Sequence, residues 1–254
     1  CITSFIEKPA KELLPLWTSN TGDEMQQQGR HYLASMGIYI FNRKLLFSLL
    51  ENEKKEATDF GKEIIPDAIN KYKVVSYQYD GYWTDIGNIY SFFEANLALT
   101  LDIPPFNLFD NQKMVYSRAR MLPPSKISGT TLEQTILAEG AIIHAQRITN
   151  SVIGIRSRIG SGSNIQSCYI MGNDFYETIE EIAHNLLRGI PKLGIGDNCN
   201  LTNVIVDKDC RIGDNVTIKG GNHLEDSDHS LLAIKDGIVV IKKGAIIPDG
   251  FELK

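Results

Sequence analysis

The sequence predicts an α/β domain followed by an all-β domain that is a left-handed parallel β-helix. Three observations carry this prediction. Strand-like and helix-like segments alternate over roughly the first hundred residues, which is typical of α/β folds. Aliphatic residues then recur six apart, which is typical of a β-helix. Pro-Pro pairs at 104–105 and 123–124 separate the two patterns. We therefore expect domains at 1–105 and 106–254, the second beginning with a linker.

Two segments of the first domain are predicted to be strands, because they are rich in β-branched and aromatic residues. They are YLASMGIYIF at 32–41 and KVVSYQYDGYW at 73–83. Helical segments lie between and after them. Alternation of this kind predicts a largely parallel sheet.

Three segments of the first domain are predicted to be helices, because their apolar residues recur on one face. They span 42–55, 58–72 and 88–101. Asn42, Asp59 and Asn88 precede these patterns, and such residues are preferred N-caps. Pro66 predicts a break or kink in the second helix.

The second domain contains a six-residue repeat in which several aliphatic residues are followed by glycine. The repeating positions are Ile136, Ile142 and Ile148, then Ile153, Ile159 and Ile165, and later Ile195, Leu201, Val206, Ile212 and either Val216 or Ile218. Two or three phase slips of one residue separate these runs. Each hexad supplies one short strand, and three hexads make a coil whose aliphatic residues point inward. Residues 171–194 break the repeat with helical spacing, so we expect a helical insertion there.

The bulk composition excludes some functions. The net charge of −5 argues against a general nucleic-acid or membrane-surface binder. No signal peptide is visible, and four cysteines without metal-ligand spacing predict small apolar residues in a reducing cytoplasm. The first residue is Cys rather than Met, so we expect a piece of a longer protein.

Four side chains in the first part of the chain suit a phosphorylated sugar and a metal ion. Lys8 is a compact charge for a phosphate, and Glu7 can accept hydrogen bonds from sugar hydroxyls. Ser35 can donate to a phosphate or sugar oxygen, and Asp85 is a hard ligand for Mg²⁺. All four are expected at strand ends or in the following loops, where ligands bind in parallel sheets. Each alone is also compatible with a structural role.

The order of several motifs resembles one family over nearly all of the chain. FIEKP is followed by ASMGIYIF, DFGKEIIP, DGYWTDIGNIYSFFEANLAL and YSRARMLPPSK, and then by hexads with SVIGIRSRI, MGNDFYE and GIVVIKKGAIIP. This run resembles glucose-1-phosphate adenylyltransferase, also called ADP-glucose pyrophosphorylase. The resemblance implies the C-terminal part of a Rossmann-like nucleotidyltransferase domain joined to the β-helix.

The resemblance also implies an activity. In that family AMP is transferred from ATP to glucose 1-phosphate with Mg²⁺, giving ADP-glucose and pyrophosphate for glucan synthesis. Lys8 matches the lysine that holds the sugar phosphate, Glu7 the glutamate on the sugar hydroxyls, and Ser35 a substrate-contacting serine. Asp85 matches one of two metal-binding aspartates, and the partner aspartate is absent here.

The β-helix of the family serves regulation and assembly, usually into tetramers. Lys208 and Lys243 match lysines that contact phosphorylated activators in plant-like members, and ordinary solvated lysines are the alternative. The family's Gly-rich loop, GGxGxR, occurs nowhere in this sequence. We therefore expect a C-terminal fragment that is inactive alone, since nothing would cradle the ATP phosphates.

Three alternatives stay open at this stage. The chain could be a non-catalytic assembly or regulatory subunit built around the β-helix. It could be a related transferase that uses another nucleotide, since only the resemblance supports ATP. Hexad β-helices also host acyltransferases, which need a catalytic histidine, and the candidates by type are His144, His184, His223 and His229. None of these histidines has a recognisable catalytic context.

Overall fold

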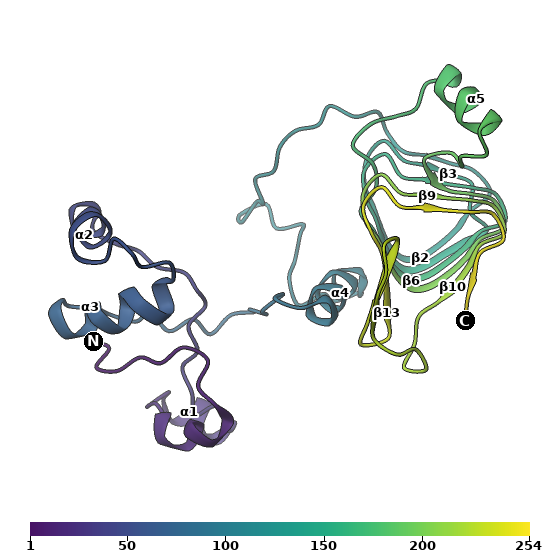
Figure 1. The fold of residues 1–254 in the computed structure, drawn as a ribbon. Helices are drawn as coiled ribbons and strands as arrows, with labels where there is room; N and C mark the ends of the chain where they lie inside the picture. Colours follow the sequence, from purple (N-terminus) through teal and green to yellow (C-terminus); the bar gives the residue numbers. More distant parts are fainter. The chain divides into compact units, whose positions relative to one another are not determined.

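The computed structural model describes residues 1–254 as two compact units, Cys1–Gly81 and Tyr82–Lys254 (Figure 1). Each unit is described by itself. No helix in either unit is both long enough and apolar enough to span a membrane.

The first unit consists of short helices joined by extended segments. The helices are η1 (Lys11–Trp17), α1 (Asp23–Gln27), α2 (Arg43–Ser48), η2 (Leu49–Glu53), η3 (Phe60–Ile64) and α3 (Ile65–Lys71). Asn42 caps α2 and Asp59 caps η3 through their side chains, so both predicted caps are confirmed. Residues 60–71 are helical without interruption, so there is no break at Pro66, although the helix changes from π to α type at Ile65. Leu49, Ile64, Ile65 and Ala68 are the buried apolar residues of this unit.

The two strands predicted for this unit are wrong, because neither 32–41 nor 73–83 forms a strand. A strand exists only where its backbone pairs with a neighbouring strand. Val74 accepts one backbone hydrogen bond, from Ile2 at 2.9 Å, and no ladder follows from it. The segments remain extended, with Ile40 98% exposed. The candidate residues Lys8 and Ser35 therefore lie in extended segments and loops, not at the ends of strands.

The second unit is dominated by a parallel β-helix made of two sheets (Figure 1). Short strands form one sheet: β1 (Lys126–Ile127), β3 (Ile142–Ile143), β5 (Arg158–Ile159), β7 (Gly194–Ile195), β9 (Arg211–Ile212) and β14 (Ile246–Ile247). The other sheet has nine strands, of which four are long: β2 (Thr131–Leu137), β4 (Arg147–Ile153), β6 (Asn164–Ile170) and β8 (Asn200–Val206). β10 (Thr217–Lys219) pairs with β8 and with β15 (Glu252–Leu253).

The strand register corrects the early part of the predicted repeat. Leu132 pairs with Ile148, and Ile148 pairs with Ile165, so successive coils are 16 and 17 residues long. A strict period of six would give 18, so the inward position shifts by two residues over the first of these coils and by one residue over the second. Ile136 and Ile142 are only half-buried, and Ile143, which follows Ile142, is fully buried. From Ile148 onward the predicted positions do form the buried core.

A left-handed residue makes the corner within each long strand. Gln134, Asn150, Ser167 and Asn203 all have φ between 44° and 53°. Asparagine tolerates this backbone region better than most residues. The Asn150 side chain donates to Ser167 Oγ at 3.1 Å, which links two successive corners. The ladder thus bends sharply without losing its register.

The last coil is interrupted by an antiparallel hairpin that the hexad pattern did not predict. It consists of β11 (Ser227–Asp228), β12 (Leu232–Lys235) and β13 (Ile238–Ile241), and β13 returns to pair with β8. Gly237 has φ 74° at the turn, where β-hairpins favour glycine.

Helix α4 (Ile89–Leu97), extended by η4 (Ala98–Thr100), packs on the outside of the β-helix. Asn88 caps it as predicted. Phe93 and Leu97 are buried against Ile205 and Ile238. This packing places α4 in the compact unit of the β-helix, although its sequence lies in the segment expected to belong to the first domain.

Helix α5 (Ile179–Leu187) lies within residues 171–194, outside the stack of coils (Figure 1). Thr178 and Glu181 form a capping box at its start. Three of the four cysteines, Cys168, Cys199 and Cys210, are free and buried in the coils, and Cys1 is exposed. Burial raises the pKa of the Cys168 thiol to about 12, so it behaves as a small apolar residue.

Candidate functional site

Glu7 and Lys8 lie in the extended segment that precedes η1. The Glu7 carboxylate is mostly buried, with its side chain 24% exposed, and the Lys8 side chain is 86% exposed. Lys8 has φ 49°, a left-handed conformation that is unfavourable for a residue with a side chain. Such strained positions cluster at functional sites. The Lys8 ammonium lies 3.8 Å from Glu7 and is otherwise open to a ligand.

The DFGKEIIP motif lies directly against this pair. A Cβ atom on Gly61 would fall 1.4 Å from Glu7 Oε2, so the carboxylate occupies the space that a side chain would fill. Asp59 Oδ1 accepts hydrogen bonds from the backbone N–H groups of Gly61 and Lys62 at 2.8 and 3.0 Å. The bond from Lys62 is the main cause of a lowered pKa at Asp59, and the nearby Lys8 charge adds to it. Sequence reasoning missed Asp59 and Gly61 as neighbours of this site.

Ser35 is tied to the same motif through aromatic rings. Its hydroxyl lies 3.1 Å from the Tyr39 hydroxyl and accepts from Gly37 N–H at 3.2 Å. The Tyr39 ring stacks on Phe60 with centroids 6.1 Å apart and planes 22° apart. The structure thus joins the Glu7–Lys8 segment and the Ser35 loop to residues 59–61. This convergence is the candidate sugar-phosphate site.

Asp85 belongs to the second compact unit and is exposed. Its Oδ1 accepts from Gly87 N–H at 3.0 Å, a turn that leads into α4. The structure holds no group of three His, Cys, Asp or Glu side chains that could bind a metal ion. Asp85 therefore offers one oxygen ligand and no complete protein site. Mg²⁺ bound here would need substrate phosphates and water as its other ligands.

Lys208 and Lys243 meet at one acidic residue of the MGNDFYE motif. Lys208 Nζ lies 2.5 Å from Asp174 Oδ1, and Lys243 Nζ lies 3.6 Å from Asp174 Oδ2. The hydrogen bond from Lys208 is the main cause of a lowered pKa at Asp174. The sequence prediction named both lysines and missed the carboxylate between them, although MGNDFYE was already conspicuous as a motif.

A buried ion pair anchors the insertion. Glu177 Oε1 lies 2.7 Å from Arg211 Nη1, with side chains 4% and 15% exposed. Glu177 also accepts from Leu193 N–H and from the Asn185 side chain. Although burial opposes ionisation, these hydrogen bonds and the Arg211 charge lower the pKa of Glu177. The pair holds both ends of the insertion against the coils.

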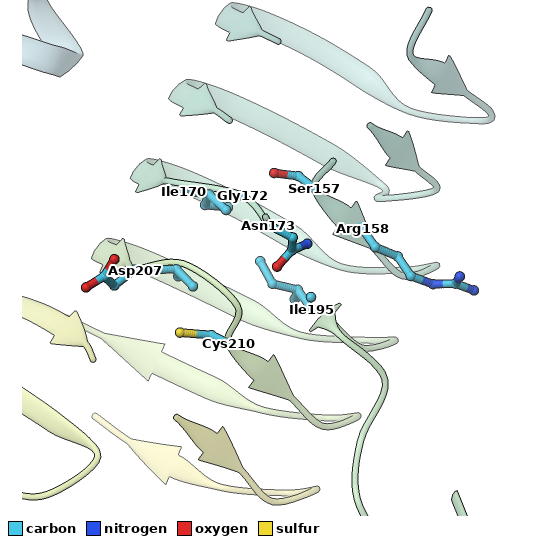
Figure 2. A pocket seen from close by; sticks show the side chains of 10 residues that line it. Ser157, Arg158, Ile170, Gly172, Asn173, Ile195, Asp207 and Cys210 are labelled. Carbon is cyan, nitrogen blue, oxygen red and sulfur yellow. The ribbon is translucent and has the colours of Figure 1, made fainter. Parts of the chain in front are cut away.

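A small cavity lies beside the root of the insertion (Figure 2). Its volume is about 10 Å³, which is near the lower limit for one water molecule. Ser157, Asn173 and Cys210 are among the residues that line it. A sugar phosphate or nucleotide is far too large for this space, so the cavity is not the candidate site.

A nucleotidyltransferase domain followed by a left-handed parallel β-helix is the class that the comparisons define. The family model described as "Nucleotidyl transferase" matches residues 1–101. The model described as "GLGC left-handed parallel beta-helix domain" matches residues 120–251, more than half of the chain. The chain belongs to this GLGC β-helix family, and its architecture is like that of ADP-glucose pyrophosphorylase.

Proposed function

We propose that this chain carries the glucose 1-phosphate-binding site of an ADP-glucose-forming adenylyltransferase. The observation that supports this most is the convergence of Glu7, Lys8 and the Ser35 loop on the DFGKEIIP motif. Lys8 would neutralise the phosphate, Ser35 would donate to a phosphate or sugar oxygen, and Glu7 would accept from sugar hydroxyls. The reaction is transfer of AMP from ATP to the sugar phosphate, with release of pyrophosphate.

The chain's residues would act by holding and neutralising the sugar phosphate rather than by covalent catalysis. An attacking phosphate that is fixed and partly neutralised approaches an α-phosphorus more readily. Bound Mg²⁺ would supply charge neutralisation on the phosphates, with Asp85 as one ligand. The sequence contains no GGxGxR stretch, so we propose that this chain alone releases no pyrophosphate.

The β-helix is proposed to serve assembly and regulation. Lys208 and Lys243 would bind a phosphorylated metabolite, since two cations on one face suit a phosphate. Homo-oligomer formation through the β-helix, and a cytoplasmic location, belong to the same proposal.

Glucose 1-phosphate binding by the chain tests this binding site. Calorimetric titration should show that Lys8→Gln weakens binding about tenfold, because the phosphate loses one direct charge-assisted contact. Lys44→Gln is a control, since Lys44 is another exposed lysine of the same unit. Equal affinity of the wild type and Lys8→Gln for glucose 1-phosphate would show that Lys8 does not bind its phosphate.

A further inference from the structure

Three successive coils stack at one corner of the β-helix beside the insertion. Asp209 N–H donates to Gly172 O at 3.3 Å, and Gly244 N–H donates to Lys208 O at 2.9 Å. The residues that flank these hydrogen bonds, among them Asp174, Lys208 and Lys243, therefore come from adjacent coils. Charged side chains from segments far apart in the sequence lie close together at this corner.

Asp174 is held between two lysines at this corner. Its Oδ1 faces Lys208 and its Oδ2 faces Lys243, so each carboxylate oxygen has its own cation. Asp174 N–H donates to Asp209 Oδ1 at 2.8 Å, which fixes the start of the insertion. Asp209 itself lies 4.0 Å from Lys243, at the limit of an ion pair.

We propose that Asp174 is a built-in competitor for an anion site formed by Lys208 and Lys243. A phosphate monoester binds there by displacing the Asp174 carboxylate from both lysines. The inference rests on the part of the proposed function that assigns these lysines to a phosphorylated ligand, and it adds the residue that sets the affinity.

Exposure and charge both favour the exchange. The side chains of Lys208, Asp174 and Lys243 are 33%, 40% and 60% exposed, so a solvent anion can reach them. Ion pairs that are this accessible to water are weak. A phosphate carries more charge and more acceptor oxygens than one carboxylate.

The test is calorimetric titration of the full chain with inorganic phosphate at low ionic strength. Asp174→Asn keeps the size and the backbone N–H, and it removes the competing charge. We expect phosphate to bind this variant about tenfold more tightly than the wild type. Adding Lys243→Gln to Asp174→Asn should return the affinity to the wild-type level or below. Asp174→Ser repeats the test should the Asn variant lose its β-sheet circular dichroism.

Asp228→Asn is the matched control, because Asp228 pairs with Lys242 alone, on the same domain. Its affinity for phosphate should equal that of the wild type. The proposal is overturned if no variant binds phosphate, if Asp174→Asn binds no more tightly than the wild type, or if Asp228→Asn tightens binding as much. The glucose 1-phosphate titration of Lys8→Gln is independent of these residues, so failure of one proposal is distinguishable from failure of the other.

Discussion

Isoleucines in the two units have opposite surroundings. Ile165 of the β-helix is 1% exposed, and Ile40 of the first unit is 98% exposed. Both lie in extended backbone. Ile165 belongs to a strand with partners on both sides, β4 and β8, whereas residues 32–41 form no strand. Burial of an apolar side chain in extended backbone therefore depends on the neighbouring strands, not on the segment alone.

The largest expected effect is on the buried side of this comparison. Ile165→Ala should lower the free energy of unfolding of the β-helix by about 3 kcal/mol, because it leaves a cavity in the core. Ile40→Ala should change the free energy of unfolding of the first unit by less than about 0.5 kcal/mol, since the side chain is already in water. Urea unfolding followed by circular dichroism measures both. A cost at Ile40 comparable with that at Ile165 would show that Ile40 is buried in solution.

The next effect concerns the charges of the β-helix. Glu177→Gln should destabilise it by about 3 kcal/mol at neutral pH, because it leaves Arg211 nearly buried without its charge partner. Glu133→Gln breaks the exposed pair with Arg147 and should cost less than about 1 kcal/mol. Thermal unfolding of both variants tests the difference, and equal costs would contradict the anchoring role of Glu177.

The same carboxylate should give a pH dependence. The pKa of Glu177 is lowered in the folded state, so its stabilising effect is complete above the unfolded pKa of about 4.3. That contribution is lost as the pH falls through the folded pKa. Unfolding measured between pH 6 and pH 3, at about unit intervals, should therefore show a smaller decline for Glu177→Gln than for the wild type. Parallel curves would contradict the assigned ionisation.

The last prediction concerns the first unit and combines a small effect on stability with a loss of ligand binding. Gly61→Ala should change the free energy of unfolding by less than about 1 kcal/mol, since alanine favours helix and the Glu7 side chain can swing away. The displaced Glu7 carboxylate should weaken glucose 1-phosphate binding about tenfold. Glu7→Gln should give a similar loss in the same calorimetric titration. Unchanged affinity of Gly61→Ala for glucose 1-phosphate would contradict a role for Glu7 in binding the sugar.

Local signals in the sequence predicted the helical segments that begin after Asn42, Asp59 and Asn88, but not η1 or α1. Asn42, Asp59 and Asn88 act on N–H groups two or three residues away, so no distant part of the chain is needed. The β-helix was predictable because each strand pairs with the equivalent strand of the next coil, so the repeat itself indicates which segments pair. The shift at Ile136 and Ile142 was not, because the 16-residue coil appears only once the register is known.

The candidate site was predictable in part, for a similar reason. Lys8, Glu7 and Ser35 were suggested by their chemistry and by motif resemblance. The packing of Glu7 against Gly61 and the position of Asp174 between two lysines are long-range contacts that no spacing rule describes. Gly61 and Asp174 nevertheless lie in motifs that the sequence analysis had identified, DFGKEIIP and MGNDFYE.

Amide hydrogen exchange with and without glucose 1-phosphate tests the functional division between the two units most directly. We expect the ligand to slow exchange at residues 7–8, 35–37 and 59–62, and to leave β4, β6 and β8 unchanged because they are already protected. Slowed exchange confined to the corner around Lys208 and Lys243, or no change anywhere at saturating ligand, would contradict the assignment of the sugar phosphate to the first unit.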